Sequence, residues 1–217
     1  MLLEGIIVRG YSGFYYVQVG EKVYECSLRG RYRLTKQDFF TGDRVKIKPV
    51  EGKEKGVIEE VLPRQTVLFR PPIANVTQVV IVMALAQPEP DLVLLDRLLV
   101  LAEQARIRPV LCFNKMDLAK PQVSQELFNL YQNIGYRVLL TSAKQEIGIE
   151  ELRDELKGEV TVLAGPSGVG KSSLLNAVQP GLKLKTGEVG KKTQRGRHTT
   201  RHVSLIPFKD SGFVADT

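Results

Sequence analysis

The sequence has little cysteine, no long apolar stretch and no low-complexity tract, and each absence excludes a class of protein. The two cysteines, Cys26 and Cys112, stand alone in strand-like segments, which argues against both a disulfide framework and a zinc site. The longest apolar run free of charge, 76–87, is too short to span a bilayer. No basic segment followed by an apolar one opens the chain, so we expect no secretory signal. These features predict a protein of the reducing cytoplasm.

The composition is that of a folded protein whose positive charge is unevenly distributed. With 217 residues, 43% hydrophobic and 25% charged, the chain can form one large domain or two modest ones. The net charge is +7, yet residues 67–160 carry −2 and residues 161–217 carry +6. The segment 182–202 alone holds seven basic residues and one acidic residue. Such a concentration favours a polyanionic partner over a merely solvated basic surface.

The first third has the pattern of a small β structure. Five short β-rich segments are separated by turn residues, at 3–9, 14–19, 22–27, 44–49 and 56–62, and none has helical periodicity. Pro63 and the pair Pro71-Pro72 then indicate a segment that cannot continue a helix or a central strand. We therefore expect a small all-β barrel of the OB-fold type over 1–66 and a linker over 67–75.

From residue 77 onwards, strands and helices alternate. Continuous apolar runs predict buried strands at 79–83, 109–113, 137–140 and 160–163. Helical spacing predicts helices after the cap residue Asp91, over 123–134, over 150–156 and up to about residue 178. This alternation is typical of a doubly wound, mostly parallel sheet. The sequence therefore predicts an α/β domain over 76–217.

A glycine-rich loop follows the last of these strands and precedes a helix. It matches G-x-x-x-x-G-K-[ST] at Gly165, Pro166, Ser167, Gly168, Val169, Gly170, Lys171 and Ser172, and Ser173 comes next. Such a loop points its backbone N–H groups at phosphate oxygens, and the helix N-terminus adds a favourable dipole. Lys171 would stabilise charge on the outer phosphates during catalysis, and Ser172 would ligate Mg²⁺. A glycine turn that contains Lys-Ser by coincidence is the alternative, and the flanking strand and helix argue against it.

Two further loops point to the base of the nucleotide. Asn114, Lys115, Met116 and Asp117 follow the strand 109–113, and Ser142, Ala143 and Lys144 follow the strand 137–140. A carboxylate such as Asp117 can accept both N–H donors on the Watson–Crick edge of guanine, whereas adenine presents an acceptor there. A backbone amide in 142–144 could meet the guanine carbonyl oxygen. Each motif alone also fits a surface turn, but three loops at the carboxyl edge of one sheet predict a guanine nucleotide site.

These motifs are those of the translation-factor-like GTPases in a changed order, because 114–117 and 142–144 precede the phosphate loop 165–172. The tract Gly196-Arg197-His198-Thr199-Thr200 and a last segment ending in Asp216-Thr217 follow that loop. With a β barrel in front, essentially the whole chain resembles the RsgA (YjeQ) family of circularly permuted GTPases. The resemblance implies an α/β P-loop GTPase domain preceded by an OB-fold barrel.

The resemblance also implies a function. It implies a GTP hydrolase that binds the small ribosomal subunit and its rRNA and assists late subunit maturation, with Mg²⁺ bound beside GTP or GDP by Ser172, Thr200 and Asp216. We expect a cytoplasmic monomer without a membrane partner. The chain stops before the Pro-Gly that completes the motif at Asp216, so we expect it to be incomplete at that end. The family's zinc-binding C-terminal domain is missing, and zinc is expected only there.

Two other functions remain open at this point. A nucleotide-gated RNA-binding module, in which hydrolysis is incidental, would use the same sequence features with the barrel as the main working part. A P-loop kinase would use the same phosphate cradle, but the motif ending in Asp117 argues against ATP, and nothing supplies a second substrate site.

Candidate residues for hydrolysis and RNA contact complete the analysis. His198 lies two residues before Thr200 and could position the attacking water, or it could be a solvated loop residue or an rRNA contact. The barrel aromatics Tyr11, Phe14, Tyr15 and Tyr16 could stack on bases, although such residues more often belong to a core. The basic candidates for RNA contact, with one tyrosine among them, are Arg29, Arg31, Tyr32, Arg33, Lys191, Lys192, Arg195 and Arg197.

Overall fold

The structure, a computed structural model, describes residues 1–30, 32, 38–69, 71–182, 184, 203–208 and 212–216. The chain divides into two compact units. Among the described residues, the first comprises Met1–Val76 with 203–207 and 215–216, and the second comprises 77–182, 184, 208 and 212–214. None of the helices in the described ranges is long and apolar enough to cross a membrane.

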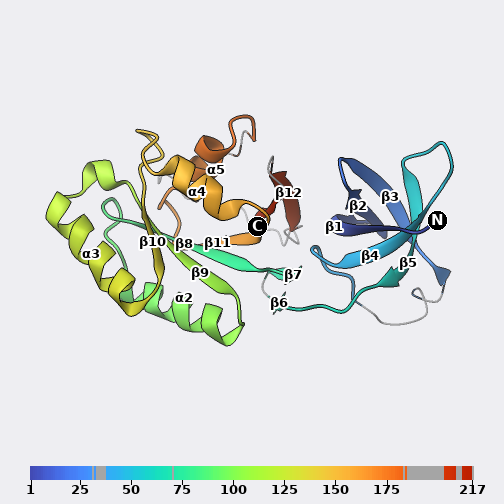
Figure 1. Cartoon of the computed structure of the whole chain (residues 1–217), viewed down its shortest axis with the longest axis horizontal. Coiled ribbons are helices and arrows are strands. Elements are labelled where there is room, and N and C mark those ends of the chain that lie inside the picture. The colour runs from blue at the N-terminus through green and yellow to red at the C-terminus, as the bar shows by residue number, and fades with distance from the viewer. Residues whose placement is uncertain are drawn as a thin grey trace, which may run out of the picture. The chain divides into compact units, whose positions relative to one another are not determined.

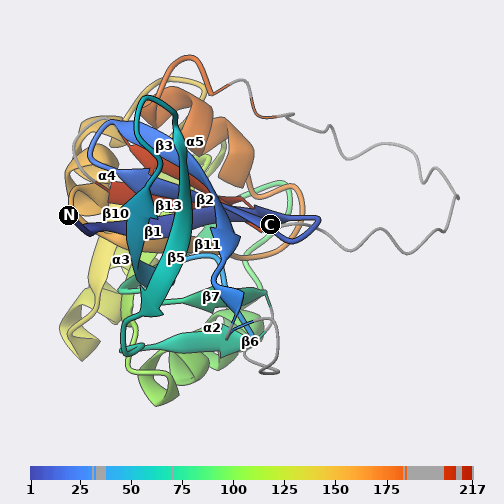
Figure 2. The ribbon, with the colours of Figure 1, turned by 90° about the vertical axis from the view of Figure 1, so that its right-hand side faces the viewer.

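The first unit contains a closed five-stranded barrel, which confirms the predicted all-β fold (Figure 2). Its strand order is β1-β2-β3-β5-β4, and β1 pairs with both β2 and β4, so that no edge stays open. Small and β-branched side chains fill the interior, among them Ile7, Val17 and Ile58, none of which is exposed. The bounds are β1 Leu3–Tyr11, β2 Phe14–Val19, β3 Lys22–Leu28, β4 Arg44–Pro49 and β5 Lys55–Val61.

The stretch expected to be a linker contains a short hairpin that the sequence analysis missed. Strands β6 (Val67–Phe69) and β7 (Pro72–Ala74) pair antiparallel. The prolines exclude a helix and a central strand here, as predicted, but Pro72 can begin an edge strand because no partner needs its missing N–H. Residues 67–69 and 72–74 therefore form paired β structure.

The second unit is built on a mostly parallel sheet with the order β10-β9-β8-β11-β13-β12. Strands β8 to β11 are mutually parallel, with Val80 of β8 opposite Val110 of β9 and Leu163 of β11. This confirms the predicted sheet. Strand β12 lies in a part of the chain for which no strand was expected. The bounds are β8 Gln78–Ala84, β9 Arg108–Asn114, β10 Arg137–Leu140, β11 Val160–Ala164, β12 Ser204–Phe208 and β13 Gly212–Asp216.

Helices cover both faces of this sheet (Figure 1). On one face, α2 and α3 pack on a core that includes Ile81, Leu111 and Phe113; on the other, α4 and α5 pack on a core that includes Val82 and Cys112. Asp91 caps α2 as predicted, because its carboxylate accepts a hydrogen bond from the Leu94 N–H at 2.9 Å. The bounds are α2 Leu92–Gln104, η1 Met116–Leu118, α3 Pro121–Ile134, α4 Ile149–Leu156 and α5 Lys171–Val178.

The two cysteines are free and buried in separate cores. Burial raises the pKa of Cys26 and that of Cys112 to about 12. Both thiols are therefore protonated at neutral pH and act as small apolar core groups.

Candidate functional site

Three loops meet at the carboxyl edge of the parallel sheet. The loops follow β9, β10 and β11, and the parallel strands bring these loops to the same edge. They are the segments 114–117, 141–144 and 165–170 in which the sequence analysis found its three motifs. Hydrogen bonds join the loops to one another, so the structure brings the three motifs together.

The phosphate loop has the backbone conformation that its glycines predict. Gly165, Gly168 and Gly170 have φ values of +134°, +82° and +99°, in the left-handed region that side chains rarely adopt. A Cβ atom on Gly165 would collide with the carbonyl oxygen of Val82 in β8, and one on Gly170 would collide with the side-chain nitrogen of Asn114. Val169 anchors the loop, since only 1% of it is exposed. The loop is thus held close to β8 and β9.

The polar groups of the phosphate loop lie at the start of α5. The ammonium group of Lys171 donates hydrogen bonds to the carbonyl oxygens of Gly165 and Pro166, both at 2.8 Å. Partial burial lowers the pKa of Lys171. Ser172 and Ser173 follow in the first helical turn and are half-buried. No side chain caps this helix, so its N-terminal amides can bind an anion.

Asn114 joins all three loops through its side-chain amide. Its nitrogen donates to the carbonyl oxygen of Val169 in the phosphate loop at 2.9 Å. Its oxygen accepts from the backbone N–H of Ala143 and from the hydroxyl of Thr141, both at 3.2 Å. Asn114 is 1% exposed, so these bonds form away from water. The sequence placed Asn114 in a motif but gave no sign of this bracing role.

Asp117 is oriented by a buried serine of the neighbouring loop. The hydroxyl of Ser142 donates to Asp117 Oδ1 at 2.6 Å, and the Gln145 N–H donates to the same hydroxyl at 3.2 Å. Ser142 is fully buried, whereas Asp117 is partly exposed. The Met116 N–H also donates to the Thr141 carbonyl at 3.1 Å, which ties the two loops together again. The carboxylate therefore has a fixed direction and still reaches solvent.

Sequence reasoning missed one residue of the site, Gln87, and did not foresee the contact made by another, Thr141. Gln87, in the loop after β8, accepts a hydrogen bond from the ammonium group of Lys115 through its backbone carbonyl. Thr141 is fully buried and donates to Asn114. A backbone carbonyl has no sequence signature, and the sequence shows Thr141 only as the first residue of the loop 141–144, not as a partner of Asn114.

Several predicted residues lie outside the part of the chain that the structure describes. These are His198 and Thr200 of the proposed catalytic and metal groups, and Arg31, Arg33, Lys191, Lys192, Arg195 and Arg197 of the proposed RNA contacts. Asp216 ends β13, which the sheet order places next to β11, and its side chain is likewise outside the description. Within the described ranges, no group of three or more His, Cys, Asp or Glu side chains could hold a metal ion.

The barrel residues that were predicted to contact RNA differ in their contacts and in the exposure of their side chains. Arg29 forms an ion pair with Glu59, and the ring of Tyr32 packs edge-to-face on Phe39. Tyr15 packs partly buried against the barrel core, which fits the core interpretation, whereas Tyr11 and Phe14 are 59% and 48% exposed.

Known protein families and proteins match this chain over nearly its whole length. A family model described as "RsgA N-terminal domain" matches residues 4–58, and one described as "RsgA GTPase" matches residues 61–217. Proteins named "Small ribosomal subunit biogenesis GTPase RsgA" are similar to it: that of Moorella thermoacetica is 55% identical over 99% of this chain and 73% of its own length. That of Carboxydothermus hydrogenoformans is 51% identical over 99% of this chain and 74% of its own.

Two solved structures agree with this match. The crystal structure of YjeQ from Thermotoga maritima has a TM-score of 0.86 and 40% identity, covering all of this chain and 74% of its own. The crystal structure of YloQ, described as a circularly permuted GTPase, has a TM-score of 0.81 and 39% identity, covering all of this chain and 71% of its own. The fold and the order of the three loops therefore define a circularly permuted GTPase that binds a guanine nucleotide. The chain belongs to the RsgA GTPase family.

Proposed function

We propose that this chain hydrolyses GTP in association with the small ribosomal subunit and assists the late maturation of that subunit. The names of its relatives support the partner, and the meeting of three nucleotide motifs around the Asn114 amide supports the chemistry. In this proposal the barrel over 1–66 contacts rRNA, the segment 67–75 links it, and the domain over 76–217 binds the nucleotide. We further propose a cytoplasmic monomer.

The nucleotide would lie across the three loops. The amides of the loop 165–170 and of the first turn of α5 would hold the phosphates, with Lys171 stabilising the charge that develops on the γ-phosphate while water attacks. Asp117 would accept from the guanine N–H groups. Because the Ala143 amide already donates to Asn114, the guanine carbonyl oxygen would be bound by the backbone N–H of Lys144. Lys115, Met116 and Ser142 would shape the base pocket.

Magnesium would bind beside the phosphates. The hydroxyl of Ser172 stands at the start of α5, directly after the phosphate loop, and oxygen is the ligand atom that Mg²⁺ prefers. Thr200 and Asp216 are proposed as further ligands on sequence grounds alone. When bound, the ion would neutralise charge on the outer phosphates. Zinc is proposed only for a segment beyond these residues.

The test of this function measures GTP turnover with and without purified small ribosomal subunits. We expect small subunits to stimulate turnover, large subunits to have no effect, and Lys171→Ala to remove the stimulation. Turnover that stays unchanged while small subunits bind the protein in a GTP-dependent way would favour a nucleotide-gated RNA-binding module.

Base selectivity is expected to change in Asp117→Asn. Asparagine can donate a hydrogen bond to the xanthine carbonyl that replaces the guanine amino group, so preference should move from GTP to XTP. Loss of a charged acceptor should weaken GTP binding by about 1.5–3 kcal/mol, or roughly 10- to 150-fold. Competition binding with GTP, XTP and ATP measures this. An unchanged preference for GTP would remove Asp117 from the site.

Phosphate binding is expected to weaken in Lys171→Ala by about 1.5–3 kcal/mol, or roughly 10- to 150-fold, because a charge-assisted contact is lost. Ser172→Ala should chiefly reduce the dependence of binding on Mg²⁺. Titration calorimetry with GTP and GDP, with and without Mg²⁺, separates the two variants. Wild-type affinity in both, in proteins that unfold at the wild-type temperature, would place the nucleotide elsewhere.

His198 is proposed to position the attacking water. The imidazole of a neutral histidine can accept a hydrogen bond from water. His198→Ala is then expected to lose subunit-stimulated turnover while keeping its affinity for GTP and for the subunit. Weaker subunit binding with a proportionate loss of turnover would instead make His198 a docking residue.

A further inference from the structure

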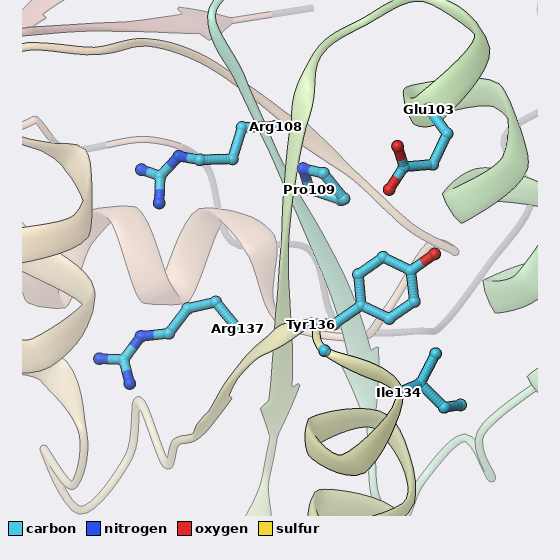
Figure 3. Close-up of a pocket in the computed structure, with 7 residues that line it drawn as sticks. Glu103, Arg108, Pro109, Ile134, Tyr136 and Arg137 are labelled. Atoms are coloured by element: carbon cyan, nitrogen blue, oxygen red, sulfur yellow. The ribbon is translucent and has the colours of Figure 1, made fainter.

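A cavity of about 360 Å³ lies at the amino ends of β9 and β10, at the opposite end of these strands from the nucleotide loops. The last turns of α2 and α3 form its other walls. Glu103, Ile134 and Tyr136 lie on one side of β9, while the guanidinium groups of Arg108 and Arg137 extend to the other side (Figure 3). The cavity therefore has an acidic, aromatic and apolar lining on the side of α2 and α3.

The two arginines that line the cavity pair with carboxylates other than that of Glu103. Arg108 pairs with Glu155 at 3.1 Å and Glu159 at 3.3 Å, and Arg137 pairs with Glu155 at 2.6 Å. These four groups balance one another, whereas Glu103 forms no ion pair with a described residue. Neither α2 nor α3 has a basic residue in its last turn, so the carbonyl ends of both helices add negative potential on the side of the cavity that holds Glu103. The cavity thus favours a cation.

An exposed apolar surface adjoins the cavity. Among the described residues, 7 of the 16 exposed large apolar side chains belong to α2 and α3, so they are concentrated on these two helices rather than scattered. They are Leu92, Val93, Val100, Leu101, Val123, Leu130 and Ile134. Val100 and Ile134 are 66% and 61% exposed. We call these residues, without Leu101, the α2/α3 surface.

The geometry of the two helices places Val100, Leu130 and Ile134 of this surface on their facing sides. The hydroxyl of Tyr131 on α3 donates to Asp96 on α2 at 2.9 Å, so the stripe of α2 that holds Asp96 faces α3. Val100 and Glu103 are four and seven residues beyond Asp96 and share that side. Leu130 and Ile134 are four residues apart on α3, and Ile134 lines the cavity together with Glu103.

The charge of the two helices indicates the kind of partner. Together they carry the acidic residues Asp96, Glu103 and Glu126 and one basic residue, Arg97, so they are net negative in a protein of net charge +7. This balance disfavours RNA, which the basic parts of the chain would attract. It suits a basic segment of a protein that has one apolar face.

We propose that the α2/α3 surface binds a basic amphipathic helix of a partner protein, with an Arg or Lys side chain of that helix entering the cavity beside Glu103 and Tyr136. The cation would lie between the carboxylate, the aromatic ring and the two helix ends. Apolar side chains of the partner would cover Val100, Leu130 and Ile134. None of these residues belongs to the nucleotide site, so this proposal is independent of the proposed function.

The test measures binding of a labelled peptide to the whole chain by fluorescence anisotropy. The probe is a helical peptide of about 18 residues made of Leu and Arg, with the leucines on one face. We expect Glu103→Gln to weaken binding by up to about fivefold, the scale of an exposed charge pair. The double variant Val100→Ser/Ile134→Ser should weaken it by about tenfold or more, because apolar contact area is lost.

Matched variants and probes decide whether this binding is specific. Leu101 is 58% exposed on α2 but lies two residues from Glu103, on nearly the opposite side, so Leu101→Ser should bind normally. Glu151→Gln on α4 should also bind normally. A peptide of the same composition without an apolar face, and a short oligouridylate, should not depend on the α2/α3 surface. Equal effects of the surface and control variants, or oligouridylate binding that Glu103→Gln changes, would overturn the proposal.

Discussion

Arg64→Ala is expected to lower the free energy of unfolding of the first unit by about 3–5 kcal/mol, because it leaves a buried carboxylate without its counter-ion. That carboxylate is Asp43, whose side chain is fully buried. Arg64 donates to both of its oxygens, at 2.7 and 2.9 Å. Chemical denaturation followed by circular dichroism measures the loss.

The effect is large because Arg64 has several contacts at once. It also donates to the carbonyl oxygen of Asp38 at 2.6 Å, and its guanidinium group lies 4.3 Å from the centre of the Phe40 ring. Asp43 in turn accepts from the Phe40 N–H at 2.7 Å. The hydrogen bonds that Arg64 donates to Asp43 raise the pKa of the guanidinium group, which stays charged across the working pH range. Removing the guanidinium group therefore takes three hydrogen bonds from the segment 38–43 at once.

A second variant separates the ion pair from simple packing. Arg64→Met with Asp43→Asn removes both charges while keeping most of the volume, and a buried pair replaced in this way often costs little. We expect the double variant to be clearly more stable than Arg64→Ala. As a control, Arg44→Ala should change stability by less than about 1 kcal/mol, since its pair with Glu4 is exposed. If the Arg64→Ala protein were as stable as the Arg44→Ala protein, the buried ion pair would not be the contact that holds the segment 38–43 in place.

Most elements of the fold were predictable because their residues repeat with a clear period. Alternating β-rich segments predicted the five barrel strands, and continuous apolar runs predicted β8, β9 and β11 to within two residues at each end. The hairpin of β6 and β7 was missed because two strands of three residues show no period, and prolines next to them suggest a linker. Strand β12 was missed because it lies close to a long polar and basic stretch.

The site was predictable only where a motif consists of residues that are close together in the sequence. The phosphate loop and the motif ending in Asp117 are read from short runs of adjacent residues, with glycine spacing fixed by the backbone they must form. The contacts that join the loops have no such spacing. Asn114 and Val169 are 55 residues apart, and Asp43 and Arg64 are 21 apart, so only the folding of the parallel sheet and of the barrel unit brings each pair together.

Asn114→Ala is expected to weaken GTP binding by about 3 kcal/mol or more, or at least roughly 100-fold, although this side chain need not touch the nucleotide. The substitution removes one donor and one acceptor from a buried position. The carbonyl oxygen of Val169 and the N–H of Ala143 then lose their partner together, and the hydroxyl of Thr141 loses one of its partners. Each buried group left unpaired costs about 1–3 kcal/mol, so the loops should separate or admit water.

The measurement must distinguish lost bracing from a lost ligand contact. Calorimetry gives the affinity for GTP, and hydrogen exchange of the Ala143 amide reports whether the loops stay joined. In Asn114→Ala we expect weak binding with fast exchange at Ala143, whereas in Lys171→Ala we expect weak binding with exchange at the wild-type rate. Gly170→Ala should resemble Asn114→Ala, because its new methyl group would displace the Asn114 amide. Slow exchange at Ala143 with near-normal GTP affinity in Asn114→Ala would show that the loops are held by other contacts.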